Sequence, residues 1–276
     1  MLQVSQLYVY PIKSLGGIAL NKARVTHRGF EYDRRWMLVD DSNLFISQRE
    51  VPQMALMAIE ISTDGLQVTY ASKKSSFIVP FEPQTKEFIN VTIWDDTCIG
   101  QLVSKEANEW FSEMLKINCR LVYMPDETQR ITDQKYAPAN SITSFSDAYP
   151  FLIIGQASLD DLNNRLDHAI PMNRFRPNIV FTGGEPFVED LMHTMSINDI
   201  LFYGVKLCAR CPIPTIDQAT AIRGKEPLKT LARYRLKNNK VLFGQNLVHE
   251  GLGEIIVRDT IEVLKLNDEE RFKVLA

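Results

Sequence analysis

The first hundred residues contain six short segments rich in β-branched and aromatic side chains, too closely spaced for helices to intervene. Clusters of turn-forming residues separate them, for example at 40–43 and 62–65. Closely spaced strands with few helices are typical of a barrel or a sandwich rather than a parallel α/β sheet. The expected strands cover residues 2–12, 34–40, 54–61, 66–71, 77–81 and 88–94.

The rest of the chain mixes helices with strands. Ser104 and Ser158 each precede apolar residues at helical spacing, so both are predicted to be helix N-caps. We predict a mostly β fold with α/β elements in two lobes, divided into residues 1–124 and 125–276. The polar stretch 125–149 is then a functional loop or the crossing between lobes. Helices are expected over 104–115, 158–166 and 226–235, and strands over 119–124, 151–155, 177–181, 201–208, 241–244 and 254–266.

Composition excludes several classes of protein. Lys and Arg total 31 against 34 Asp and Glu, a net charge of −3, which argues against a general nucleic-acid binder but permits a local basic pocket. No apolar run approaches the ~18 residues of a membrane span, and the N-terminus does not resemble a signal peptide. Four cysteines are too few for a disulfide scaffold. The sequence therefore predicts a cytoplasmic protein with neither nucleic acid nor membrane as a partner.

Cys208 and Cys211 form a C-x-x-C pair. A structural zinc site needs a second pair of ligands, which the scattered histidines do not provide. A redox pair usually begins a helix, and Pro214 disfavours one here by pushing Ile213 toward extended geometry. Two interpretations stay open. The pair is either two partly buried free cysteines or the source of one thiolate ligand, with Arg210 beside it favouring the charged form.

Three other segments suit an anion. Lys13 and Ser14 follow a strand and precede two glycines, so an ammonium, a hydroxyl and backbone amides are available to a phosphate. Arg34 stands at the start of the next predicted strand and offers a second positive charge. Arg174, Arg176 and Asn178 point to one side if their segment is extended, an arrangement suited to phosphate or to the edge of a heterocycle. For each segment the alternative is an ordinary strand end or turn. The adjacent acids Glu189 and Asp190 are expected to be exposed.

Taken in order, eight segments resemble the MOSC proteins, named after the C-terminal domain of molybdenum cofactor sulfurase. The resemblance runs from about residue 2 to residue 265, and the layout is similar to that of the amidoxime-reducing branch of the family. It implies an N-terminal β-barrel domain and a MOSC domain with a molybdopterin-type molybdenum cofactor in the cleft between them. The segments are LYVYPIKSLGG, DRRWMLVD, FISQRE, RFRPNIVFTG, PFVED, CARCPIPTID, EPLKTLARYR and FGQN.

The resemblance also implies roles for individual residues. Cys211 would ligate molybdenum, because soft thiolate and dithiolene sulfurs suit that metal, and Cys208 would support it. Asp190 is a candidate general acid. The cofactor's phosphate and pterin would be held by Lys13, Ser14, Arg34, Arg176, Asn178 and Arg210, with Arg35 and Arg174 as further candidates.

The implied activity is the two-electron reduction of small N-hydroxylated compounds. The chain lacks the clustered cysteines of an iron–sulfur domain, so electrons would come from a separate ferredoxin or flavoprotein reductase. Two alternatives stay open: a sulfur carrier with a persulfide on Cys208 or Cys211, and a non-catalytic carrier of the cofactor. The family is also associated with pyridoxal phosphate proteins.

Overall fold

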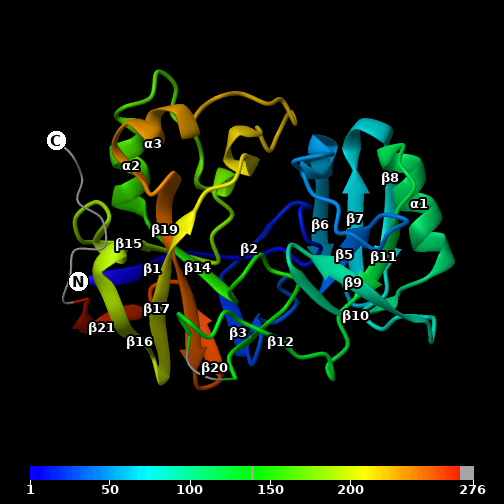
Figure 1. Ribbon diagram of the computed structural model, residues 1–276, viewed down its shortest axis with the longest axis horizontal. Helices are drawn as coiled ribbons and strands as arrows, with labels where there is room; N and C mark the ends of the chain where they lie inside the picture. Colours follow the sequence, from blue (N-terminus) through cyan, green and yellow to red (C-terminus); the bar gives the residue numbers. More distant parts are fainter. Residues whose placement is uncertain (138–139, 268–276) are drawn as a thin grey trace.

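The computed structural model describes residues 1–137 and 140–267, which form a larger and a smaller lobe (Figure 1). In the larger lobe seven strands close into a barrel, because the last strand of the path pairs back with the first. The prediction of a mostly β fold is confirmed. In barrel order the strands are β14 (Phe151–Gly155), β15 (Ile179–Thr182), β1 (Leu2–Val9), β21 (Thr260–Leu266), β16 (Met192–Ile197), β17 (Ile200–Ala209) and β19 (Lys240–Glu250).

The barrel is held together by apolar side chains that point inward from alternate strand positions. Val4, Leu7 and Val9 of β1 are fully buried, whereas the residues between them are partly open. They pack with Phe151, Phe202 and other apolar residues in one core. Burial of apolar side chains is the main source of stability here, at about 1.5–3 kcal/mol for each large side chain.

The smaller lobe consists of two antiparallel sheets and one helix. Its core buries Trp36 and Phe111 with aliphatic residues from both sheets. Ser104 caps α1 (Lys105–Leu115) by accepting a hydrogen bond from the Ala107 amide, as predicted. The sheets are β5 (Trp36–Val39), β11 (Arg120–Tyr123), β10 (Asp96–Leu102), β9 (Phe88–Ile93), and β6 (Met57–Ile61), β7 (Leu66–Tyr70), β8 (Ser75–Val79).

Two short helices lie against the barrel, α2 (Gln156–Asn163) and α3 (Leu228–Tyr234). The predicted N-cap at Ser158 is wrong, because α2 begins two residues earlier and Gly155 stands at the cap. The Ser158 hydroxyl is buried; it donates to Glu189 and accepts from the Phe187 amide. No helix among the described residues is long and apolar enough to cross a membrane.

The strands of the first thirty residues belong to the larger lobe, whereas Ile12 and Leu15 between them pack into the core of the smaller lobe. β1 pairs with β15 and β21, and β3 (Lys22–Thr26) pairs with β20 (Gly253–Ile256). The pairing of strands thus does not follow a single division of the chain at residue 124. The chain crosses into the smaller lobe directly after β1, which brings the Lys13 loop to the junction of the lobes. The remaining strands are β2 (Ile18–Leu20), β4 (Gly29–Phe30), β12 (Arg130–Ile131), β13 (Ile142–Thr143) and β18 (Leu236–Lys237).

Candidate functional site

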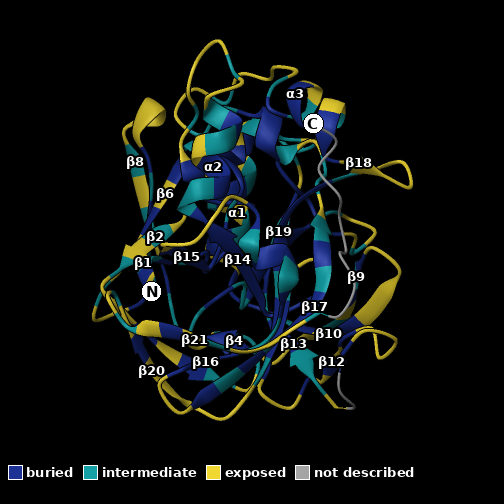
Figure 2. Ribbon diagram, turned by 90° about the vertical axis from the view of Figure 1, so that its left-hand side faces the viewer, coloured by how far each residue is buried: buried dark blue, intermediate teal, exposed yellow. Residues whose placement is uncertain are grey.

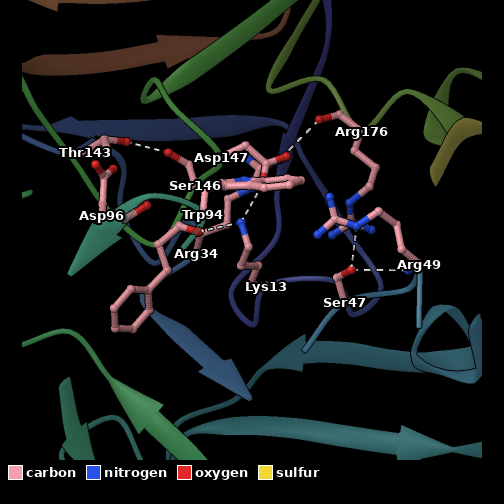
Figure 3. Close-up of polar contacts among 12 residues, drawn as sticks. Lys13, Arg34, Ser47, Arg49, Trp94, Asp96, Thr143, Ser146, Asp147 and Arg176 are labelled. Atoms are coloured by element: carbon pink, nitrogen blue, oxygen red, sulfur yellow. Dashed lines mark hydrogen bonds and ion pairs between the residues drawn. The ribbon is translucent and has the colours of Figure 1, made fainter. Parts of the chain in front are cut away.

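Lys13 lies buried at the junction of the lobes (Figure 3). Its ammonium donates to the Phe145 carbonyl at 2.9 Å and to an Asp147 carboxylate oxygen at 2.6 Å. Burial lowers the pKa of Lys13 to about 8, although the charge of Asp147 opposes this shift. The surroundings of Lys13 therefore favour its neutral form more than water does. A bound anion would raise the pKa of Lys13 again, because it stabilises the charged ammonium.

Arg34 and Arg176 share one aromatic ring. Their guanidinium carbons lie 4.4 and 4.2 Å from the centroid of Tyr10. Arg34 also pairs with the buried Asp33 at 2.6 Å and donates to the Asn178 side chain at 3.1 Å. These contacts bring together three predicted residues, Arg34, Arg176 and Asn178, although Arg176 lies in a left-handed backbone conformation and not on a strand. The predicted single strand face of Arg174, Arg176 and Asn178 is wrong, because β15 begins only at Ile179.

Gly17 makes room for the Tyr10 ring. A β-carbon at Gly17 would lie 2.4 Å from a ring carbon of Tyr10, closer than real contacts allow. We expect Gly17→Ala to displace the ring with both arginines and to lower the free energy of unfolding by roughly 1–3 kcal/mol. Gly224→Ala is the matched control, since its nearest neighbouring atom is 3.8 Å away. Thermal melts of both variants test this, and equal melting temperatures would contradict it.

The loop 143–147 completes this side of the site. Buried Arg130 fixes it by donating to the carbonyls of Ser144 and Asp147 at 3.0 and 3.1 Å and to the carbonyl of Ser146. Arg130 is itself paired with Asp96. The Ser144 hydroxyl is buried without a hydrogen-bond partner among the described residues. Sequence reasoning marked 125–149 only as a possible functional loop and missed its individual residues.

The smaller lobe adds Arg49 and Trp94 to the site. Neither residue was predicted from the sequence as a site residue. The Arg49 guanidinium stacks 4.0 Å from the Trp94 ring centroid and donates to the Ser47 hydroxyl. The Trp94 indole N–H donates to Asp147 at 3.3 Å. An arginine and a tryptophan far apart in sequence carry no local motif, so only the fold brings them together.

Cys211 belongs to the larger lobe and lies close enough to this group for its charges to act on the thiol. Burial raises the pKa of its thiol, and the charges that act on it are those of Asp147, Arg210 and Arg49. All four cysteines are free. The Arg210 guanidinium lies against the other cysteine of the pair, 3.1 Å from the Cys208 sulfur, and donates to the Phe175 carbonyl. The expectation that Pro214 pushes Ile213 into extended geometry is wrong, since a short 3₁₀ turn spans Ile213–Thr215.

Ser14 lies beside Lys13 and is buried, with its backbone in a left-handed conformation. Its carbonyl accepts from the Gln48 amide at 2.7 Å, and Gln48 exchanges hydrogen bonds with Gln218 of the larger lobe. Arg174 and Arg35 already have partners elsewhere. Arg174 donates to the Pro214 carbonyl and pairs with Asp217, and Arg35 contacts Tyr123 and Asp126.

The expectation that Glu189 and Asp190 are exposed is wrong. Both are buried behind the barrel, where Asp190 pairs with Arg235 at 2.5 Å. Burial, and then the neighbouring Asp190, raise the pKa of Glu189 to about 7. The structure places the candidate general acid Asp190 on the 3₁₀ turn Val188–Leu191, in an ion pair with Arg235.

The group has the features of an anion site that a further molecule would complete. Arg176 Nη2 and Arg210 Nε are buried polar atoms without partners among the described residues, as is the Ser144 hydroxyl. A pocket of about 520 Å³ adjoins Arg176 and is lined from both lobes, by Gly16 and Ala55 on one side and Gln218 on the other. A larger pocket of about 930 Å³ shares no residue with this group. Within the described residues no three His, Cys, Asp or Glu side chains are grouped so that they could hold a metal ion.

Two family models match the chain: the MOSC N-terminal beta barrel domain over residues 1–118 and the MOSC domain over residues 140–262. The chain belongs to the MOSC family. This MOSC protein is 32% identical to mitochondrial amidoxime-reducing component 1 of Mus musculus, over 95% of this chain and 82% of that protein. The Homo sapiens protein of the same name is 31% identical, with the same coverage. A molybdenum cofactor sulfurase of Oryza sativa subsp. japonica is 27% identical over 92% of this chain and 33% of its own length.

These comparisons confirm the resemblance stated from the sequence. They give no support to an association with pyridoxal phosphate or to sulfur carriage. The amidoxime-reducing relatives are mitochondrial by name, so the cytoplasmic location stays a prediction.

Proposed function

We propose that this MOSC protein binds a molybdopterin-type molybdenum cofactor at the junction of its lobes and reduces small N-hydroxylated compounds. One observation carries the proposal. Partly buried cations from both lobes, with unpartnered donors on Arg176 and Arg210, gather at the junction, and the charges of Arg210 and Arg49 act on the half-buried Cys211. Such a cluster suits a ligand that has a phosphate at one end, a heterocycle in the middle and a thiophilic metal at the other.

The residues present fit that group. Lys13, Ser14 and Arg34 would hold its phosphate, while Arg176, Asn178 and Arg210 would meet the pterin and Cys211 the metal. We add Ser144 to these cofactor-binding residues, because its buried hydroxyl has no hydrogen-bond partner among the described residues. When bound, the cofactor supplies two-electron oxygen removal, and the protein orients it and keeps competing reactions out.

The chain's own contribution is mainly electrostatic. The Arg34–Asp33 pair and the Tyr10 ring fix the two arginines before any ligand arrives, so little reorganisation is needed on binding. Asp190 is held in its pair with Arg235 and is not used as an acid in this proposal.

The proposal predicts molybdenum and pterin in protein purified from a host that makes the cofactor. It also predicts reduction of benzamidoxime to benzamidine with reduced methyl viologen as an artificial electron donor. Protein that contains molybdenum but does not reduce benzamidoxime would favour a cofactor carrier. Protein without molybdenum but with cyanide-labile sulfur on Cys208 or Cys211 would favour a sulfur carrier.

A further inference from the structure

One segment of the larger lobe is strongly basic although the whole chain has a net charge of −3. Between residues 218 and 249 there are seven Lys and Arg residues and a single acid, Glu226. The carboxylate of Glu226 accepts a hydrogen bond from the Thr230 amide at the start of α3. The segment therefore forms a local positive surface.

Five bases of this segment are exposed and make no ion pair among the described residues. Some exposed bases elsewhere in the chain are paired, for example Lys22 with Glu254 and Arg24 with Glu31, and others, such as Lys86 and Lys265, are not, but they are not concentrated in one segment. Unpaired exposed charges of one sign raise the potential at a surface and attract a partner of opposite sign. The five, called here the basic face, are Arg223, Lys225, Lys229, Arg233 and Lys240.

Two of these residues share one face of α3, and a third follows the hairpin turn of β18, a strand that contacts α3. Lys229 and Arg233 are four residues apart on α3 and point outward together, because Leu231 and Tyr234 occupy the buried side of the helix. Lys240 ends a tight hairpin whose turn residues, Asn238 and Asn239, both adopt left-handed conformations. Figure 2 shows this hairpin and the outer side of α3 open to solvent.

The basic face begins at the junction of the lobes. The Arg223 guanidinium reaches across the junction to the backbone carbonyls of Gln48 and Arg49 in the smaller lobe. Arg49 is one of the charges that act on Cys211. Beside Arg223 the apolar side chain of Ile222 is 68% exposed. In Figure 1 the gold segment before α3 reaches toward the smaller lobe at this point.

We infer that the basic face is the docking surface for an acidic electron-carrier protein, an inference that rests on the proposed function. Reduction of one N–OH group to N–H and water breaks one N–O bond and consumes two electrons and two protons. A reduced ferredoxin-type carrier supplies the electrons in two successive one-electron steps and is itself oxidised, while the protons come from solvent. Charge complementarity brings such a carrier to the end of the site where Cys211 lies, and it acts mainly on the rate of association.

Direct binding tests the inference without turnover. Isothermal titration calorimetry would measure binding of an acidic plant-type [2Fe–2S] ferredoxin to the cofactor-loaded protein at low and high salt. We expect Lys229→Glu with Arg233→Glu to weaken binding roughly tenfold at low salt, equivalent to about 1.4 kcal/mol. The loss should shrink at high salt because exposed charges are screened. The control, Lys86→Glu with Lys265→Glu, makes the same charge change at exposed residues of other elements and should bind like the wild type.

Equal ferredoxin affinity of the two double variants, or no binding by the wild type, would overturn the docking surface. Wild-type protein that binds vesicles of phosphatidylserine and phosphatidylcholine, or duplex RNA, in place of the ferredoxin would overturn it as well. Benzamidoxime reduction with methyl viologen, measured on the same samples, decides the proposed function separately. Thermal melts check that all variants fold.

Discussion

Cys211→Ser is expected to abolish benzamidoxime reduction and to remove one sulfur from the metal's coordination shell. A serine oxygen is a hard ligand and does not replace a thiolate on a metal that also binds dithiolene sulfur. X-ray absorption at the molybdenum edge counts the sulfur neighbours directly. The fold should be retained, since the thiol is only half-buried and serine has nearly the same shape.

Cys208→Ser is the matched comparison. The Cys208 sulfur contacts Arg210 at 3.1 Å and packs against the core that contains Leu231 and Phe243. Its replacement should lower the melting temperature while the sulfur count at molybdenum stays unchanged. An unchanged count in Cys211→Ser would remove the assignment of Cys211 as the metal ligand, and a reduced count in Cys208→Ser would transfer that role to Cys208.

Local patterns in the sequence predicted local structure well. Alternating apolar residues located most strands, and Ser104 was correctly predicted as an N-cap. Ser158 has the same sequence signature but serves a buried hydrogen-bond network with Glu189, a role that depends on a contact 31 residues away. Sequence alone does not reveal which of two similar serines has a distant partner.

The candidate site shows the same limit. Lys13, Arg34 and Arg176 were found because basic residues next to strand ends and glycines form short patterns. Arg49 and Ser144 were not found. Arg49 lies in the family segment FISQRE, but no short pattern there marks it as a site residue, and nothing near Ser144 in sequence distinguishes it from a surface residue. For Asp190 the error was the reverse. The sequence predicted an exposed carboxylate, but Asp190 is buried in an ion pair with Arg235, a residue too distant in sequence to be recognised as its partner.

Lys13→Ala and Arg34→Ala are both expected to release the cofactor, since charge-assisted contacts to a phosphate contribute roughly 1.5–3 kcal/mol each. Their effects on the apo-protein should differ. Arg34→Ala leaves Asp33 buried without its ion-pair partner and should also lower the apo melting temperature. Lys13→Ala leaves Asp147, whose side chain is 61% exposed and can be solvated, so the apo melting temperature should hardly change. Lys22→Ala, which removes an exposed paired lysine, should alter neither property.

The pH dependence of apo-protein stability tests the role of Lys13 separately. Its pKa is about 8 in the folded protein against 10.5 for the free side chain, so between these values the unfolded chain binds the extra proton. Apo wild-type stability should therefore rise as pH increases from about 8 toward 10.5, by at most about 3 kcal/mol, relative to Lys13→Ala. Binding of phosphate needs the charged ammonium and should weaken over the same interval. Denaturant unfolding of the apo-protein and calorimetry with inorganic phosphate would measure the two opposite slopes. Parallel slopes in wild type and Lys13→Ala would show that Lys13 is only a strand-end charge.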